Sequence, residues 1–267
     1  MEVIGYLASI LIGISLGMIG GGGSILTVPV LVYLMGMNPL LATTCSLFIV
    51  GTASLAGSVR SFTKNQVDLK AVTEFGIPSI VSIFFTRRYF LPALPDTIFS
   101  AGRFAVSKDM FLMVLFAILM VAASTSMIKN RNPEVANQAT DKNRQNKLIP
   151  LILLGLIIGV ITGLLGAGGG FLIIPALVIF LKLPMKTAVG SSLLIIAINS
   201  LLGFLFSLNQ FEYNWKVILI FTGMSIAGIF VGSKLADKIP GVKLKKGFGW
   251  FVLIMGIYII IKETLLK

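Results

Sequence analysis

The chain has 267 residues, of which 56% are hydrophobic and 12% are charged, whereas soluble domains carry about 25% charged residues. Its mean hydropathy of +0.98 excludes an ordinary water-soluble domain. At about 20 residues for each helical crossing of a bilayer, the apolar stretches predict an all-α polytopic membrane protein with about eight transmembrane helices and no separate soluble domain.

The charge pattern excludes several classes of partner and chemistry. There are 22 Lys and Arg residues against 10 Asp and Glu, and the basic residues lie in short segments between apolar runs, as the positive-inside rule predicts for a protein of the plasma membrane. We therefore expect the lipid bilayer as its surroundings and no nucleic-acid partner. Because the chain has no histidine and one cysteine, it lacks the ligand sets of common zinc and haem sites, and we expect no metal and no cofactor.

Apolar runs separated by charged residues predict the helices. In chain order, they lie near residues 3–19, 24–36, 39–62, 68–90, 109–128, 148–165, 170–182, 184–209, 213–236 and 246–263. The N-terminal run lacks the basic residues of a signal peptide, so we expect it to be retained. The long polar stretch at residues 129–147 has five basic and two acidic residues, which is typical of a solvated linker. It divides the chain into a first membrane repeat, residues 1–128, and a second, residues 148–267.

The two repeats align without a gap at an offset of 146 residues. Over residues 13–57, 16 of the 45 aligned pairs are identical. The identical pairs include Gly13 and Gly159, Gly17 and Gly163, Gly20 and Gly166, Gly22 and Gly168, Gly23 and Gly169, Pro29 and Pro175, Ala42 and Ala188, and Ser46 and Ser192. An ungapped run of glycine and proline identities indicates an internal duplication, which is a common architecture of transporters.

The relative orientation of the repeats depends on whether the glycine runs form hairpins. If they do, each repeat makes an odd number of crossings and the repeats are inverted; if the helix continues, they are parallel. In the hairpin arrangement the loops near residues 60–70, 129–147, 182–186 and 234–246 share one side with 15 basic residues, against 7 on the other side. In the continuous arrangement each side has 11. The positive-inside rule therefore favours inverted repeats with both termini outside.

The glycine runs are the strongest candidate for a binding site. Each glycine costs a helix about 1 kcal/mol relative to alanine, so the helix is expected to break, and broken backbone at membrane depth must be buried in protein or line a polar cavity. A helix that restarts there directs free amides and its positive dipole end toward an anion. The candidate substrate-binding residues are Gly20, Gly21, Gly22, Gly23, Ser24, Gly166, Gly168, Gly169 and Gly170, with Gly22, Gly23, Ser24, Gly168, Gly169 and Gly170 as backbone donors. The alternative is close helix packing, which we favour for the flanking pairs Gly13 and Gly17, Gly159 and Gly163, and Gly228 and Gly232.

A second cluster of small and hydroxyl residues begins the next helix in each repeat. It comprises Thr43, Thr44, Cys45 and Ser46 in the first repeat and Gly190, Ser191 and Ser192 in the second, with Asn199 about two turns later. Hydroxyl and amide donors there would complete the coordination of an oxyanion without a fixed charge, which suits reversible binding. The alternative is that the hydroxyls bond the preceding turn of their own helix. Cys45 is expected to pack.

Few ionisable residues lie inside the predicted spans. Glu74 is a candidate for a coupling proton if it is buried. Lys70 precedes it by four residues, the spacing of a surface ion pair, and that alternative is favoured. Arg60 and Lys216 lie near predicted helix ends, where they extend toward the interface and either one would attract anions to a vestibule.

The sequence gives no support to an enzyme. A dinucleotide-binding motif would need glycine or alanine where Ile25 and Phe171 stand, and no lysine follows either glycine run as a phosphate loop requires. Paired acidic motifs that hold Mg²⁺ are absent from the sequence.

The duplicated glycine run, the proline six residues after it and the cluster that begins the next helix resemble the sulfite exporter TauE/SafE family of membrane proteins over nearly the whole chain. The resemblance implies a transporter of sulfur-containing oxyanions or organosulfonates, such as sulfite, thiosulfate or sulfoacetate, commonly an exporter. The family's glycine motif corresponds to Gly20–Gly23 and Gly166–Gly170, and its hydroxyl cluster to Thr43–Ser46 and Gly190–Ser192. Two features depart from it: Ala167 replaces a glycine, so the two breaks need not be equivalent, and the segment 87–108 is longer and more basic than its counterpart after Lys234 and shares no motif with it.

These observations predict an inverted-repeat secondary transporter in which two broken helices hold a small anion near the bilayer midplane while the repeats rock around it. A passive anion channel and a membrane scaffold or assembly factor without transport are the alternatives. A homo-oligomer is compatible with the sequence.

Overall fold

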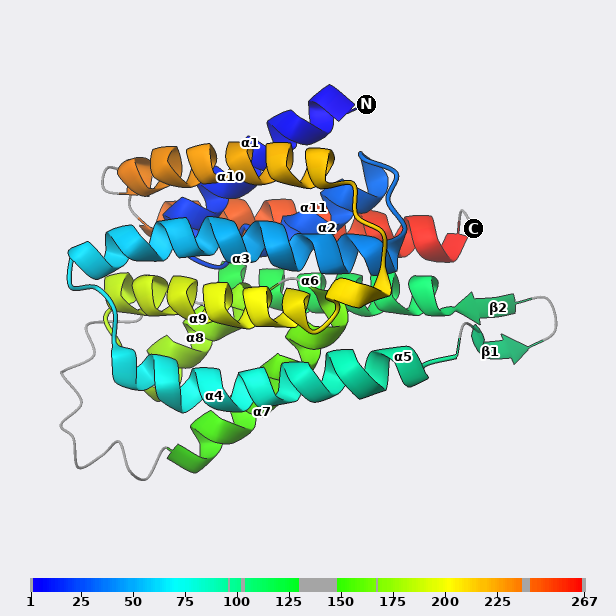
Figure 1. The fold of residues 1–267 in the computed structure, drawn as a ribbon. Helices are drawn as coiled ribbons and strands as arrows, with labels where there is room; N and C mark the ends of the chain where they lie inside the picture. Colours follow the sequence, from blue (N-terminus) through cyan, green and yellow to red (C-terminus); the bar gives the residue numbers. More distant parts are fainter. Residues whose placement is uncertain are drawn as a thin grey trace.

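The computed structural model describes residues 2–95, 97–101, 104–129, 148–166, 168–236 and 241–265. Most of the predicted linker, residues 130–147, lies outside them. The described chain forms a bundle of helices with one short β-hairpin at one end (Figure 1). In order, the elements are α1 (Glu2–Ile19), α2 (Ser24–Tyr33), α3 (Pro39–Thr63), α4 (Leu69–Phe85), a π-helical turn (Thr86–Phe90), α5 (Leu91–Ala93), β1 (Thr97–Ala101), β2 (Phe104–Ser107), α6 (Lys108–Lys129), α7 (Leu148–Leu165), α8 (Gly170–Phe180), α9 (Met185–Leu205), a 3₁₀ turn (Leu208–Gln210), α10 (Trp215–Ala236) and α11 (Gly241–Leu265).

Five helices in the described part of the chain are long and apolar enough to cross a membrane. They are Pro39–Thr63, Leu69–Ala93, Lys108–Thr125, Met185–Gln210 and Trp215–Ala236. Shorter apolar helices are Ile4–Ile19, Ser24–Tyr33 and Ile149–Leu165. This composition is that of a polytopic membrane protein. The antiparallel strands β1 and β2, which pair Thr97 with Ser107, are an addition that the apolar pattern did not predict.

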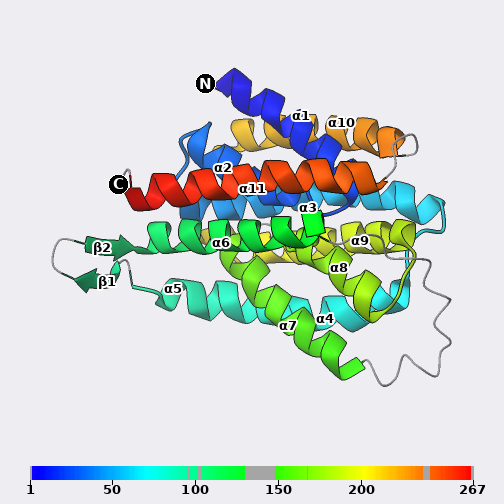
Figure 2. The ribbon, with the colours of Figure 1, turned by 180° about the vertical axis from the view of Figure 1, so that it is seen from behind.

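The helix breaks lie where the glycine runs predicted them. α1 ends at Ile19 and α2 begins at Ser24, while α7 ends at Leu165 and α8 begins at Gly170. In Figures 1 and 2, α1 enters from the end of the bundle where both termini lie, and α2 returns to that end. α7 and α8 do the same from the opposite end, so the two breaks meet in the middle of the bundle.

Helices of the first half of the chain pack against helices of the second half. α3 lies against α9, and α6 lies against α11. α1 packs on α10 while α7 packs on α4, and α3 contacts α10 while α4 contacts α9. The offset of 146 residues converts the α1–α10 contact into the α7–α4 contact and the α3–α10 contact into the α9–α4 contact, and it converts the α3–α9 contact into itself. The offset extends to helix starts beyond the aligned motifs, because Asp68 caps α4 by accepting from the Ala71 amide and Asn214 accepts from the Val217 amide at the start of α10.

The flanking glycines form close helix contacts, as the sequence predicted. A β-carbon on Gly13 would collide with the carbonyl of Ser225 in α10, and one on Gly159 would collide with the carbonyl of Ser79 in α4. Gly228 likewise faces the α1 backbone. Small residues let membrane helices approach this closely.

The apolar core consists of two clusters of buried side chains. Leu16, Phe116 and Phe221 belong to a cluster shared by α1, α6 and α10, and Phe75 and Ile196 belong to one shared by α4 and α9. Ile19 and Ile25, on either side of the first glycine break, belong to the first cluster, whereas the second break lies between Leu165 of the first cluster and Ile173 of the second.

Candidate functional site

The glycine runs form two tight turns inside the protein. Gly20 and Gly166 end α1 and α7 with φ angles of 78° and 67°, a region that side-chain-bearing residues rarely adopt. A β-carbon on Gly21 would overlap the backbone of Gly170, so the two turns are in direct contact. All residues from Gly20 to Ser24 are buried.

The two turns are not equivalent, as the replacement of one glycine by Ala167 predicted. Gly23 has φ −64° before α2, whereas Gly169 has φ 65° before α8. The Ser24 amide donates to the carbonyl of Gly21 at 3.3 Å and is therefore engaged within its own turn. Among the described residues, no backbone carbonyl accepts from the amides of Gly22 or Gly23, which keeps these two as candidate donors.

Each glycine turn lies against the hydroxyl cluster of the other half of the chain. A β-carbon on Gly20 would lie 3.2 Å from the Ser192 hydroxyl in α9, and one on Gly166 would collide with the carbonyl of Thr43 in α3. The sequence predicted both clusters but did not specify which glycine turn each one contacts. Only the packing of α3 against α9 brings a turn and a cluster from different halves together.

Several predicted cluster residues have structural partners. The hydroxyls of Thr43 and Ser192 donate to carbonyls three residues earlier, the alternative that the sequence left open. Ser191 accepts from the amide of Asp68 at 2.8 Å, and Asn199 donates to Ser79 at 2.7 Å. A β-carbon on Gly190 would collide with the 64–68 loop. Cys45 is buried in the apolar core, as expected.

Other buried polar atoms have no hydrogen-bond partner in the part of the chain that the structure describes. They include the hydroxyls of Ser46, Thr162 and Ser200. Thr162 lies beside Gly169, and Ser200 lies beside Gly168. Buried polar groups without partners are rare because they lose hydrogen bonds to water. The hydroxyls of Thr162 and Ser200 beside the second turn are therefore not satisfied by the described part of the chain.

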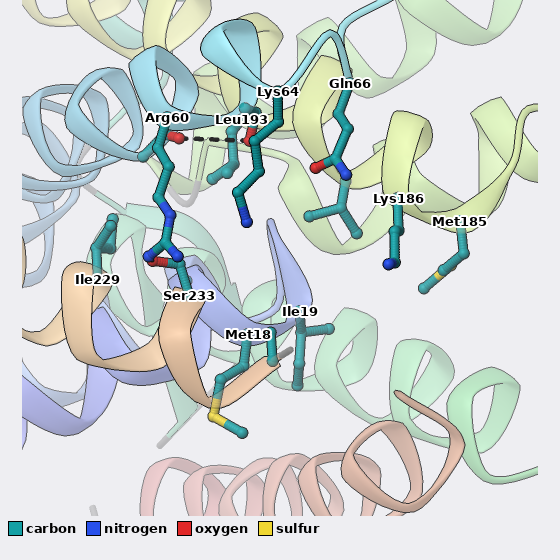
Figure 3. A pocket seen from close by; sticks show the side chains of 15 residues that line it. Met18, Ile19, Arg60, Lys64, Gln66, Met185, Lys186, Leu193, Ile229 and Ser233 are labelled. Carbon is teal, nitrogen blue, oxygen red and sulfur yellow. Dashed lines mark hydrogen bonds between the residues drawn. The ribbon is translucent and has the colours of Figure 1, made fainter. Parts of the chain in front are cut away.

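A basic cavity of about 290 Å³ opens beside the turns, at the end of the bundle that carries the 64–68 loop. We call it the vestibule. Arg60 and Lys64 reach it from α3 and its C-terminal end, and Lys186 reaches it from α9 (Figure 3). The Arg60 guanidinium donates to the Ser233 hydroxyl at 2.5 Å. Among the described residues that line the vestibule there is no carboxylate.

The inner wall of the vestibule is one residue away from the first glycine turn. Gly17 and Ile19 of α1 line it, and so does Val189 of α9. A β-carbon on Gly20 would lie 2.8 Å from Val189, so the same side chain faces both the cavity and the turn. The predicted glycine residues themselves do not line the cavity, because they are buried behind this wall.

Arg87 is a buried charge that the sequence analysis counted only as a loop residue. It is completely buried in the π-helical turn after α4, and its Nη1 donates to the Thr44 hydroxyl at 2.9 Å. Its place inside a long apolar helix, directly before the exposed Arg88, was the signal that could have identified it.

The remaining ionisable candidates lie outside this region. Glu74 is half-buried on α4, and Lys216 is exposed at the start of α10. In the described part of the chain, no group of three or more acidic, cysteine or histidine residues is placed to hold a metal ion.

Comparison with known proteins identifies the family of the chain. The sequence profile of the sulfite exporter TauE/SafE family matches residues 5–259. The chain belongs to this family. A probable membrane transporter protein of Xylella fastidiosa strain Temecula1 is 30% identical over 259 residues, which covers 94% of this chain and 91% of that protein. A probable membrane transporter protein of Methanocaldococcus jannaschii is 29% identical, covering 86% and 84%, and the probable membrane transporter protein YunE of Bacillus subtilis is 25% identical, covering 83% and 82%.

Membership in the TauE/SafE family agrees with the composition and with the five long apolar helices: the protein is a multi-pass membrane protein. Its relatives are named as transporters and not as enzymes. No solved structure matches the chain.

Proposed function

We propose that the protein is a secondary transporter that exports small sulfur-containing anions, such as sulfite, thiosulfate or organosulfonates, across the plasma membrane. One observation carries the proposal: the inner wall of a vestibule lined by Arg60, Lys64 and Lys186 includes Val189, whose side chain also faces Gly20 of the first glycine turn. A cleft lined by one sign of charge raises the local concentration of ions of the opposite sign. An anion drawn into it reaches the part of the fold where helices begin inside the protein.

The packing of the helices supports inverted repeats. Contacts of α1 with α10 and of α7 with α4 are equivalent at the offset of 146 residues, and the two broken-helix pairs enter from opposite ends of the bundle. Transporters built in this way move one repeat against the other around a central site. The direct contact of Gly21 with Gly170 lies at the place around which such a movement would occur.

The distribution of basic residues supports the export direction. The vestibule opens at the end of the bundle that carries the loops at residues 64–68 and 181–184 (Figure 1). By the positive-inside rule that end is cytoplasmic. The cavity therefore accepts substrate from the cytoplasm.

The test is flux of radiolabelled sulfite into proteoliposomes that contain the purified protein, with and without a pH gradient, in competition with thiosulfate, sulfoacetate and sulfate. We expect saturable flux with counterflow and inhibition by at least one other sulfur oxyanion. Flux without saturation or counterflow would identify a channel. Absence of flux for all four anions from folded protein would favour a scaffold.

A further inference from the structure

Arg87 lies on the opposite side of the glycine turns from the vestibule. Its neighbour Thr86 contacts Gly163 of α7, and Thr43, next to its partner Thr44, contacts Gly166. The Arg87–Thr44 pair is therefore beside the second turn, where α3 begins.

The two ends of the bundle differ at equivalent positions. At the offset of 146 residues, Arg87 corresponds to Ser233, which lines the open vestibule. At the Arg87 end, the connection between α9 and α10 covers the site: Gln210 Nε2 donates to the Arg87 carbonyl at 3.5 Å, and the Tyr213 hydroxyl donates to the Ser207 carbonyl at 2.9 Å. The vestibule is open at one end of the bundle, whereas Arg87 at the other end is completely buried beneath the α9–α10 connection.

The Arg87 guanidinium is only partly satisfied by the protein. Nη1 bonds Thr44, but Nε and Nη2 are buried and have no hydrogen-bond partner among the described residues. Burial, reinforced by the nearby Cys45 thiol and opposed by Arg87, raises the pKa of Tyr213 to about 12, so this neighbouring phenol is neutral at physiological pH. In the residues that the structure describes, no carboxylate within ion-pair distance neutralises Arg87 either.

A completely buried cation without a counterion is strongly unfavourable. Arginine presents its N–H groups in a planar fork whose geometry matches two oxygens of one anion. The Thr44 hydroxyl accepts from Arg87 and donates to the Leu40 carbonyl at 3.2 Å, so it positions the guanidinium. We propose that Arg87, held by Thr44, forms a binding site for a small free oxyanion at the second glycine turn. The assignment of this anion as the transported one depends on the proposed function, whereas the site itself does not. Because the guanidinium is completely buried, a lipid headgroup does not reach it in this conformation.

The experiment measures binding of radiolabelled thiosulfate to the full-length protein, purified in detergent without phospholipid, by scintillation proximity. The variants are Arg87→Gln, Arg87→Lys and Thr44→Val, and the matched control is Arg88→Gln, which removes an exposed arginine one residue away. We expect R87Q to lose about tenfold or more in affinity, because charge-assisted hydrogen bonds are lost. R87K and T44V should lose less, and R88Q should bind as the wild type does.

Thermal unfolding separates a binding role from a structural one. In buffer without an oxyanion, R87Q should unfold no earlier than the wild type, because an unpaired buried charge has been removed. Added thiosulfate should raise the melting temperature of the wild type and of R88Q but not that of R87Q. If R87Q does not fold, R87K and T44V provide the test, and wild-type affinity in both would overturn the proposal.

Two further outcomes would overturn the site: affinity of R87Q equal to that of the wild type, or no saturable binding of thiosulfate, sulfite or sulfate by the folded wild type. The proposed transport function fails separately. If the wild type binds the anion through Arg87 but gives no flux in proteoliposomes, the binding site is supported and the transport function is contradicted. If flux is saturable and R87Q changes neither binding nor flux, the transport function is supported and the Arg87 binding site is contradicted.

Discussion

Gly21 and Gly170, which belong to different halves of the chain, touch through their backbones, with no room between them for a single β-carbon. The contact joins the start of α8 to the turn before α2, and it lies where both broken-helix pairs end inside the bundle. Any movement of one half against the other must therefore change the contact between Gly21 and Gly170. Its tightness makes it sensitive to the smallest possible substitution.

We predict that Gly21→Ala lowers both stability and flux. Gly21 does not have a positive φ, so alanine fits its backbone conformation and only the overlap with Gly170 opposes it. Overpacking of this kind costs about 1–3 kcal/mol. Gly223→Ala is the control, because Gly223 is helical with open space around it, and alanine there should stabilise the helix by up to about 1 kcal/mol. Equal melting temperatures and flux for the two variants would contradict a packed contact at Gly21.

We predict that the vestibule charges control the rate at which anions enter. Replacing Arg60, Lys64 and Lys186 together by glutamine should lower kcat/KM for sulfite by about tenfold at low ionic strength, because charge-lined clefts concentrate counterions. The difference should shrink in high salt, where exposed charges are screened. Lys216→Gln, at the other end of the bundle, is the control. A salt-independent loss would mean that these residues support the fold and not the entry of anions.

Glu74→Gln tests the coupling role that the sequence suggested. If Glu74 carries a coupling proton, the variant will transport sulfite at a rate that no longer depends on a pH gradient. Lys70→Gln removes the exposed cation four residues earlier and should leave that dependence intact. The measurement is flux into proteoliposomes with and without the gradient. If the flux of E74Q still depends on the pH gradient, Glu74 does not carry the coupling proton and another group must do so.

Tyr213 should make stability depend on pH in the alkaline range. Its phenol has a pKa of about 12 in the folded protein against 10.0 in the ordinary case, so the folded state keeps a proton that the unfolded chain releases. This stabilising contribution is complete below pH 10 and is lost as the pH rises from 10 to 12. Melting temperatures should therefore fall less over this interval for Tyr213→Phe than for the wild type. Tyr89→Phe, at an exposed tyrosine, should behave as the wild type does.

Much of the fold followed from composition and glycine placement. The helix breaks after Ile19 and Leu165 were predicted because consecutive glycines remove both side-chain packing and helix propensity. The close contacts of Gly13 and Gly159 were predicted from the spacing of small residues alone. These are local properties of the chain, which a sequence carries directly.

The partners of the predicted site residues did not follow from the sequence. Thr43 and Ser192 each lie against the glycine turn of the other half of the chain. The reason is that α3 packs against α9 in addition to the broken helices of its own half. The vestibule likewise combines Arg60 with Lys186, residues separated by more than a hundred positions. Such pairings depend on how helices pack, and no spacing rule within one helix specifies them.

The sequence by itself determined that this protein is a multi-pass membrane protein of the TauE/SafE family, with two similar halves that each break at a glycine run, because hydropathy and glycine content act locally on the chain. Only the tertiary structure decided that Arg87 is buried beside Thr44 while Arg88 is exposed. Two adjacent arginines have the same chemistry in the sequence. They differ because one side chain of a helix faces its neighbours and the next faces away, so packing alone selects which of the two charges is buried.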